Sequence, residues 1–252
     1  MTIRNTLLAF AALGALCAAP AQAQWATLKG KFKTDAAPAP AVELTCNKDP
    51  ATCCAKKLID QSLVVSKDLD VANVFIYARS KVAKIDPSLE KDLKPLTLDN
   101  KDCVFLPHAA IIWTKQKLVL KNSDPVGHNT NYGSAVQGFN VLIAPNESVE
   151  KSLSGGENLP QNVSCNIHPW MQAKLLVRDN PYFAVSAEDG TFEIKNVPTT
   201  GEIEYVVWHE KAGYLGALKF NGGVTDAKGR FKLKAAADQD LGTITIPLSK
   251  LK

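Results

Sequence analysis

The segment "VSCNIHPWMQAK", residues 163–174, contains three side chains that could bind one metal ion. Cys165 is followed three positions later by His168, and His168 is followed three positions later by Met171. Met171 is the only methionine besides Met1. A thiolate and an imidazole bind zinc or copper, whereas a thioether is a soft ligand that copper accepts and zinc seldom uses. The segment therefore predicts a site for a soft metal ion, with copper favoured over zinc.

A mononuclear type 1 (blue) copper site has two imidazoles, one thiolate and a weak axial thioether. This segment therefore lacks one histidine, and the candidates are His108, His128 and His209. His128 follows the predicted strand "KLVLK", in a turn that could present it to Cys165. His108 begins another predicted strand and is expected to be a capping or surface residue. His209 lies far downstream and is expected to be structural, so His128 is the favoured ligand.

Other uses of these ligands fit the sequence less well. A catalytic zinc ion needs an open coordination position and a nearby general base, and residues 163–174 contain no carboxylate. A c-type haem needs Cys-x-x-Cys-His, which the sequence lacks. A copper ion with four protein ligands has no open position for a substrate. The chain is therefore predicted not to be an enzyme.

The cysteine count supports a metal role for Cys165. Of the six cysteines, Cys17 lies in an N-terminal leader, so an odd number remains. An exported chain can form disulfides, and one thiol must then stay free or bridge to another chain. Cys165 is the predicted free thiol, because it alone has potential metal ligands beside it. The favoured pairing is Cys53 with Cys103 and Cys46 with Cys54. Other pairings remain open on sequence alone.

The leader, residues 1–23, has the layout of a secretory signal peptide. Arg4 gives it a positive start, and the apolar run 7–19 is too short to span a bilayer. Ala21-Gln22-Ala23 is a small-x-small cleavage site. We expect cleavage after Ala23 and a periplasmic or secreted location. No later segment is apolar enough to span, so the chain is not expected to be an integral membrane protein.

The rest of the chain favours an all-β fold of the sandwich type. Short β-rich runs alternate with turn sequences such as "NSDP", "SGGEN" and "NGG". The predicted strands cover 63–65, 71–78, 109–113, 117–121, 174–179, 191–197, 203–210, 230–234 and 243–247. The best helical candidate is short, at 88–93. The net charge of +4 is weak and its lysines are scattered, so no nucleic-acid partner is expected.

"CNIHPWM" resembles the copper loop of small cupredoxins of the amicyanin and plastocyanin type, with Cys-x-x-His-x-x-Met spacing and a proline after the histidine. The upstream run "FLPHAAIIWTKQKLVLKNSDPVGHNT" resembles the cupredoxin segment that delivers the first histidine. The resemblance covers about residues 96–179. It implies a cupredoxin Greek-key β-sandwich. One departure is "TKQK", where the family has a glycine turn.

The cupredoxin resemblance also implies roles for individual residues. The equatorial ligands would be His128, Cys165 and His168, and Met171 would be the axial ligand. Asn129 would tie the two ligand loops together near the sulfur. His168, Pro169 and Trp170 would place an imidazole edge near an apolar surface, where a redox partner protein could dock.

A second region, "YFAVSAEDGTFEIKNVPTTGEIEYVVWHEKAGY", resembles a carboxypeptidase regulatory-like or transthyretin-like (Ig-like) sandwich. The N-terminal runs "WATLKGKFKT" and "VANVFIYAR" resemble its first strands. A nested order is therefore expected: outer-module strands in 24–94, an inserted cupredoxin-like copper domain in 95–180, and the rest of the outer module in 181–252. The whole chain resembles exported proteins sometimes labelled methylamine utilisation proteins.

The residues support two classes of function. The first is an exported type 1 copper protein with one mononuclear site that carries single electrons. The alternative is a non-redox binding module of the envelope, for a carbohydrate or protein partner, or a protein for copper storage or delivery. Reversible redox cycling would distinguish an electron carrier from these alternatives.

Overall fold

The computed structural model describes residues 24–252 except 80, 83 and 92. The predicted signal peptide, residues 1–23, lies outside the described residues. In the described part the only helices are α1 (Ser88–Lys91) and the short 3-10 helix η1 (Leu248–Lys250). The predicted all-β sandwich class is confirmed. No helix in the described part is long and apolar enough to cross a membrane.

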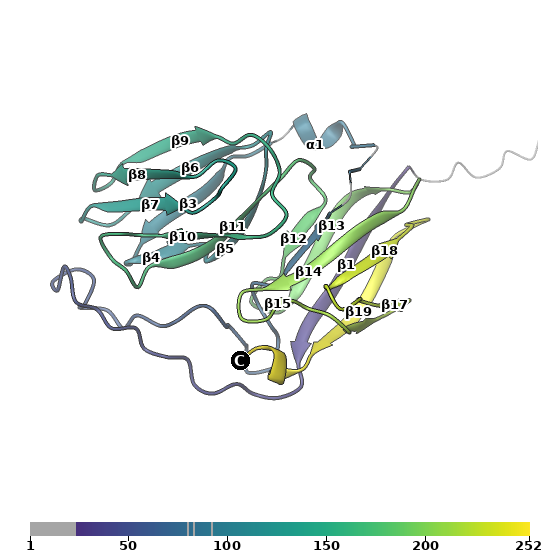
Figure 1. Cartoon of the computed structure of the whole chain (residues 1–252), viewed down its shortest axis with the longest axis horizontal. Helices are drawn as coiled ribbons and strands as arrows, with labels where there is room; N and C mark the ends of the chain where they lie inside the picture. Colours follow the sequence, from purple (N-terminus) through teal and green to yellow (C-terminus); the bar gives the residue numbers. More distant parts are fainter. Residues whose placement is uncertain (1–23, 80, 83, 92) are drawn as a thin grey trace, which may run out of the picture.

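Strands β3 to β11 form one sandwich, which we call the inner sandwich (Figure 1). Its first sheet has the order β4-β3-β6-β9, with β3 Leu96–Lys101, β4 Val104–Leu106, β6 Lys117–Asn122 and β9 Ser148–Ser152. Its second sheet has the order β5-β11-β10-β7-β8, with β5 Ala109–Trp113, β7 His128–Tyr132, β8 Phe139–Ile143, β10 Gln161–Ser164 and β11 Gln172–Arg178. The pairs β3–β6 and β5–β11 are parallel, so the chain crosses between the sheets.

The remaining strands form a second sandwich, the outer sandwich, at the right of Figure 1. One sheet has the order β13-β1-β19, with β1 Trp25–Thr34, β13 Thr191–Pro198 and β19 Gln239–Ile246. The other sheet has the order β12-β2-β14-β15, and β18 also pairs with β14. Its strands are β2 Phe75–Ala78, β12 Phe183–Val185, β14 Ile203–His209, β15 Gly213–Tyr214 and β18 Arg230–Leu233. A small hairpin joins β16 (Lys219–Phe220) and β17 (Gly223–Val224).

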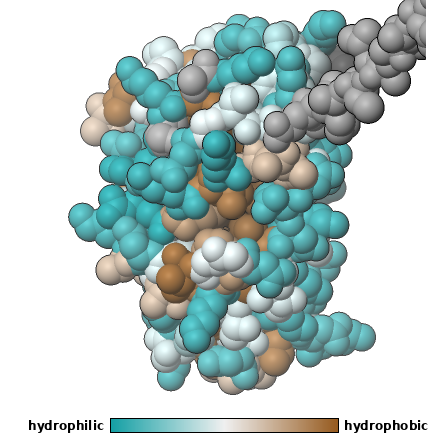
Figure 2. All heavy atoms as spheres, turned by 90° about the vertical axis from the view of Figure 1, so that its right-hand side faces the viewer, coloured by the Kyte–Doolittle hydropathy of each residue, from teal (hydrophilic) through white to brown (hydrophobic). Residues whose placement is uncertain are grey.

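Each sandwich has its own apolar core, made by strands that bury alternate residues. In β13, Phe192 and Ile194 face inward while Thr191 and Glu193 face water, the pattern of a sheet with one solvated face. Phe32, Tyr205 and Ile244 belong to the outer core. The inner core includes Leu98, Leu120, Val163 and Leu175. Figure 2 shows the side of the outer sandwich as mostly hydrophilic, with hydrophobic residues in a narrow central band.

A third cluster joins the two sandwiches. Strands β2 and β14 contribute Phe75, Tyr77 and Val206, and strands β5 and β11 contribute Ala109, Ile111 and Leu176. These strands are buried on both faces, which explains the continuous burial of β2 and β5. The two sandwiches are therefore packed sheet against sheet.

The segment between β1 and β2 connects the two sandwiches in a second way. It is mostly irregular and runs below both of them in Figure 1. Cys53 and Leu58 from this segment are buried in the core of the inner sandwich. The structure contains the disulfides Cys46–Cys54 and Cys53–Cys103, and the second ties this segment to the inner sandwich. This is the disulfide pairing favoured from the sequence, whereas the burial of Cys53 and Leu58 in the inner core was not predicted.

The predicted strands correspond to observed strands except at 63–65. There the structure contains only an isolated bridge between Val65 and Val71. The predicted helix at 88–93 is α1, one turn long. The run "TKQK" forms the tight turn between β5 and β6, closed by Gln116 N–H on the Trp113 carbonyl at 2.8 Å. A glycine is therefore not needed at this turn.

Candidate metal centre

Three predicted ligands come together at one end of the inner sandwich. The Cys165 Sγ lies 3.9 Å from His128 Nδ1 and 3.7 Å from His168 Nδ1. The exposed fractions are 0% for both imidazoles and 1% for Cys165. Cys165 is the free cysteine of the described residues. These ligand atoms all lie within 4.8 Å of one another and could hold one metal ion.

Short connections between strands position these side chains. His128 is the first residue of β7, and Cys165 directly follows β10, which pairs with β7. The loop from β10 to β11 closes on itself, because Cys165 N–H donates to the Met171 carbonyl at 3.2 Å and Met171 N–H donates to the His168 carbonyl at 2.9 Å. Met171 is 1% exposed and belongs to the same core cluster as Cys165.

Asn129 joins the two ligand-bearing segments. Its Oδ1 accepts hydrogen bonds from the backbone N–H groups of Asn166 at 2.8 Å and Ile167 at 3.3 Å, and lies 3.4 Å from Cys165 Sγ. Its Nδ2 donates to Asn140 Oδ1 at 2.7 Å, which fixes the orientation of the amide. Asn129 thus restrains the cysteine loop next to the sulfur.

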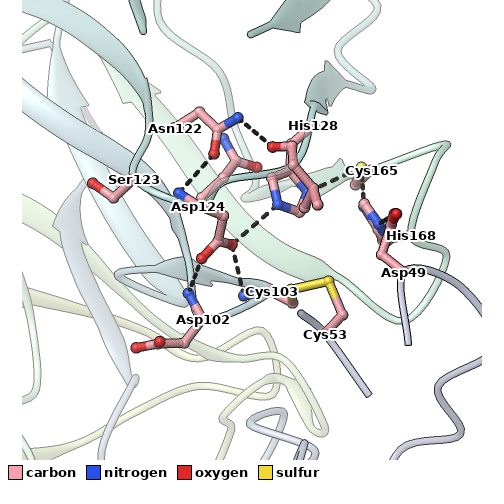
Figure 3. A network of polar contacts seen from close by, with 12 residues as sticks. Asp49, Cys53, Asp102, Cys103, Asn122, Ser123, Asp124, His128, Cys165 and His168 are labelled. Atoms are coloured by element: carbon pink, nitrogen blue, oxygen red, sulfur yellow. Dashed lines mark hydrogen bonds and ion pairs between the residues drawn. A yellow bond between two sulfur atoms is a disulfide. The ribbon is translucent and has the colours of Figure 1, made fainter. Parts of the chain in front are cut away.

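Asp124 holds the far nitrogen of His128 (Figure 3). Its Oδ2 lies 3.0 Å from His128 Nε2, and its two oxygens accept the N–H groups of Asp102 and Cys103 at 2.8 Å each. Asn122 Oδ1 accepts the Asp124 N–H at 3.0 Å. A buried carboxylate with three donors is stably ionised. It therefore holds His128 Nε2 as a donor, so Nδ1 is the nitrogen that faces the sulfur and gives up its proton when a metal binds.

A second carboxylate holds the far nitrogen of His168. Asp49 Oδ2 lies 2.7 Å from His168 Nε2. Asp49 comes from the disulfide-closed loop 46–54, which is part of the segment between β1 and β2. Because this loop covers the ring, the imidazole edge of His168 does not itself reach the surface.

Hydrogen bonds set the protonation of the site. Burial by itself would raise the pKa of Cys165, but contacts with His128 and with the backbone of Asn129 and His168 lower it to about 6. Burial would lower the pKa of His128, but bonds to Asp124 and Cys165 raise it to about 9. Burial likewise opposes ionisation of Asp124, but the bond from His128 and two backbone N–H groups hold its pKa below the ordinary value. Cys165 is therefore a thiolate at neutral pH, the form that binds metals.

The spacing of the ligand atoms fits a metal ion. In metal sites a nitrogen ligand lies about 2.0 Å and a sulfur ligand about 2.3 Å from the ion, so a nitrogen and a sulfur at roughly 120° are about 3.7 Å apart. The observed Sγ–Nδ1 distances are 3.9 Å and 3.7 Å. Two imidazoles and a thiolate, with a thioether buried in the same loop, are the donor set of a type 1 copper site.

Pro169 and Trp170 lie between His168 and solvent-accessible space. Trp170 packs beside His168, with ring centroids 5.1 Å apart and ring planes tilted by 59°, and its Nε1 donates to the Cys103 carbonyl at 3.1 Å. Both residues line a cleft of about 510 Å³ whose other walls include His108, Lys174 and Glu210. Met171 and Gln172 of the ligand loop line the same cleft.

The two other histidines lie outside the ligand cluster. His108 was predicted to be a capping or surface residue, but it is 9% exposed and its Nε2 lies 2.6 Å from Glu210 Oε2 of the outer sandwich. Packing of the two sandwiches buries it. His209 is fully buried and accepts the Lys211 N–H at 3.2 Å, a structural role as predicted. Burial lowers the pKa of His209 to about 4.

Sequence reasoning missed both carboxylates. Asp124 lies four residues before His128, so the run "NSDPVGH" contained a signal for it. Asp49 is 119 residues from His168, and no spacing in the sequence relates the two.

Comparisons with known proteins give limited similarity. No family model and no curated protein matches the chain. Among solved structures, a Cu-containing nitrite reductase from Thermus scotoductus SA-01 is 16% identical with a TM-score of 0.33, covering 38% of this chain and 27% of that chain. A mutant of amicyanin in the Cu(I) form is 12% identical with a TM-score of 0.30, covering 42% of this chain and 99% of that chain. An oxidised amicyanin mutant is 13% identical with a TM-score of 0.30, covering 41% of this chain and 91% of that chain. The chain thus spans about a quarter of the nitrite reductase chain.

Proposed function

We propose that this chain is an exported type 1 copper protein that carries single electrons and is not an enzyme. His128, Cys165 and His168 would be the equatorial ligands and Met171 the axial ligand of one mononuclear site. The observation that carries the proposal is the buried convergence of two Nδ1 atoms on one free sulfur, at 3.9 Å and 3.7 Å. A bound copper ion would supply a one-electron couple.

The residues around the ligands favour an electron carrier over copper storage or delivery. A delivery protein must let its ligands move so that the ion can leave. Both imidazoles are held by carboxylates, at 3.0 Å and 2.7 Å, and both are fully buried. Such a preorganised site changes little between oxidation states, which favours electron transfer.

We propose that residues 95–180 form the inserted copper domain, with residues 24–94 and 181–252 forming the outer module. The strand order supports this division, because β2 and β12 flank the inner sandwich in sequence and pair with each other. The redox partner would be a protein that docks near His168 at the cleft edge formed by Pro169 and Trp170. The leader supports export to the periplasm or beyond.

Copper loading of the mature chain, residues 24–252, tests the proposed function. With Cu(II), the protein should show an intense thiolate-to-copper absorption band and should cycle reversibly between two oxidation states. Cys165→Ser should remove the band, and Asn166→Ser in the same loop, whose side chain is exposed, should retain it. A copper complex without this band would contradict a type 1 site. Release of Cu(I) to a chelator without reversible cycling would favour the delivery alternative.

A further inference from the structure

We propose that Asp49 is a positioning residue of the metal centre. Its carboxylate, presented by loop 46–54, orients His168, lowers the reduction potential of the bound copper and restricts electron exchange at the His168 edge. The inference rests on the proposed copper function and deepens it.

The contact is short and built into the fold. Asp49 Oδ2 lies 2.7 Å from His168 Nε2; the imidazole side chain is 0% exposed and the carboxylate side chain 35%. The Asp49 carbonyl accepts the N–H groups of Thr52 at 3.0 Å and Cys53 at 2.8 Å, which closes the turn. The disulfides Cys46–Cys54 and Cys53–Cys103 close the loop and tie it to the inner sandwich.

The contact fixes the ring of His168 for metal binding. Nε2 donates a hydrogen bond to the carboxylate, which leaves Nδ1, 3.7 Å from Cys165 Sγ, as the nitrogen that can bind the metal. A carboxylate on the far nitrogen of a ligand histidine holds its tautomer and makes it a more basic ligand. Asp124 makes the equivalent contact with His128. Each imidazole is therefore oriented by its own carboxylate.

The charge of Asp49 favours the oxidised ion. The site already has a thiolate from Cys165 and a buried carboxylate from Asp124, and Asp49 adds another negative charge across one imidazole ring. Negative charge stabilises the more positive oxidation state. For one charge at a partly exposed position, we expect about a tenfold change in the relative affinities for the two oxidation states.

The position of Asp49 also covers the ring edge that would otherwise meet a small redox reagent. His168 is fully buried, with Asp49 at its Nε2 and Trp170 beside its ring, so both residues lie on the approach of a reagent to the imidazole. Removing the carboxylate therefore has two effects that can be separated. Loss of charge changes the rates with cationic and anionic reagents in opposite directions, whereas loss of cover raises both.

The experiment compares Asp49→Asn and Asp49→Ala with the wild type, each as the copper-loaded mature chain. Asp49→Asn should raise the midpoint potential by about 59 mV, the equivalent of a tenfold affinity change for one electron. It should slow oxidation of the reduced copper protein by the cationic reagent tris(1,10-phenanthroline)cobalt(III) and speed its oxidation by the anionic reagent hexacyanoferrate(III). Asp49→Ala should raise the potential at least as much, with a further rate increase for both reagents.

Asp60→Asn is the matched control. Asp60 belongs to the same segment, its side chain is 33% exposed, and its contacts are with Ser62 and Lys211 rather than with a ligand. The midpoint potential of the Asp60→Asn variant should equal that of the wild type. If Asp49→Asn retains the thiolate-to-copper band but has the potential and rates of Asp60→Asn, the role of Asp49 is overturned while the copper function stands. A wild type without the band overturns both.

Discussion

His128 and His168 each use both ring nitrogens. The Nδ1 atoms face Cys165 Sγ, and the Nε2 atoms bond to Asp124 and Asp49. Each ring is fixed in angle by the carboxylate at its Nε2 before any metal binds, so little conformational entropy remains to be lost on binding. The low pKa of Cys165, about 6, follows from the same arrangement.

Asp124 should matter for both stability and metal affinity. Asp124→Asn removes the charge and replaces an acceptor oxygen with a donor nitrogen, while three N–H groups still need acceptors. The unfolding free energy should fall by about 2–4 kcal/mol, measured by urea denaturation. Copper affinity should fall about 10- to 100-fold, measured by competition with a chelator.

Asp99→Asn is the control for Asp124. Asp99 is also partly buried and accepts hydrogen bonds from Ser123 N–H and Oγ–H, at 3.1 Å and 2.8 Å, but its carboxylate contacts no ligand residue. It should lose some stability while keeping the affinity for copper. Equal affinity in the Asp124 and Asp99 variants would contradict a role for Asp124 at His128.

At the scale of elements, the site is delivered by the start of β7 and by the turns and loops around it. The turn after β6 is shaped by Asn122, whose Nδ2 lies within hydrogen-bond distance of three carbonyls, those of Val126, Ile143 and Ala144, at 2.8, 3.1 and 3.2 Å. The turn between β3 and β4 places Asp102 and Cys103 at positive φ, 56° each, so that both N–H groups face Asp124. Positive φ is costly for such residues, and the carboxylate compensates for it.

Loop 46–54 should depend on its own disulfide. A Cys46→Ala/Cys54→Ala double variant loses a short covalent ring, so its unfolding free energy should fall by about 2–3 kcal/mol. Asp49 should be held less firmly, and both reagents should then oxidise the reduced copper protein faster. Denaturation and stopped-flow absorption measure the two effects.

The contrast is Cys53→Ala/Cys103→Ala, which opens a longer ring, with a sequence separation of 50. The unfolding free energy of this variant should fall by more, about 4 kcal/mol. If the Cys46→Ala/Cys54→Ala variant retains wild-type rates with both reagents, then Cys53–Cys103 is enough to hold the cover, and the shorter disulfide has no part in it.

For the whole molecule, the contact between the sandwiches decides the surroundings of the metal centre. Arg178, at the end of β11, is 4% exposed and donates to the carbonyls of Ala78 in the outer sandwich, at 2.8 Å, and of Glu157. Its guanidinium also lies over the Tyr77 ring, 5.4 Å from the centroid. One planar cation thus satisfies carbonyls from both sandwiches.

Arg178→Met should weaken this contact. It leaves buried carbonyls without their donors, so the unfolding free energy should fall by about 2–4 kcal/mol. Arg178→Lys keeps the charge but not the planar fork, and should give an intermediate loss. Chemical denaturation followed by tryptophan fluorescence measures both.

Arg79→Met is the control for Arg178. Arg79 forms an ion pair with Glu204 at 3.1 Å, and its side chain is 41% exposed. Its loss should cost at most about 1 kcal/mol. Equal losses for the Arg79 and Arg178 variants would indicate that the buried guanidinium does not hold the sandwiches together.

The sequence by itself determined the all-β class, eight of the nine predicted strands and the spacing of the ligand loop. The alternation of apolar and polar residues along "TFEIKNV" predicts which face of this strand is buried. The spacing of Cys165, His168 and Met171 fits a single loop that brings the three side chains together. Local signals of this kind depend on neighbours a few residues apart. His128 could be predicted as a ligand because it follows a predicted strand and a polar turn.

Only the tertiary structure decided what surrounds the ligands. Asp49 meets His168 across 119 residues and His108 meets Glu210 across 102. Such contacts depend on how the sandwiches pack and on where the irregular segment before β2 is tied down. The irregular segment before β2 has no hydrophobic periodicity from which its structure could be predicted. Its path is set by the disulfides and by the few apolar residues that it buries.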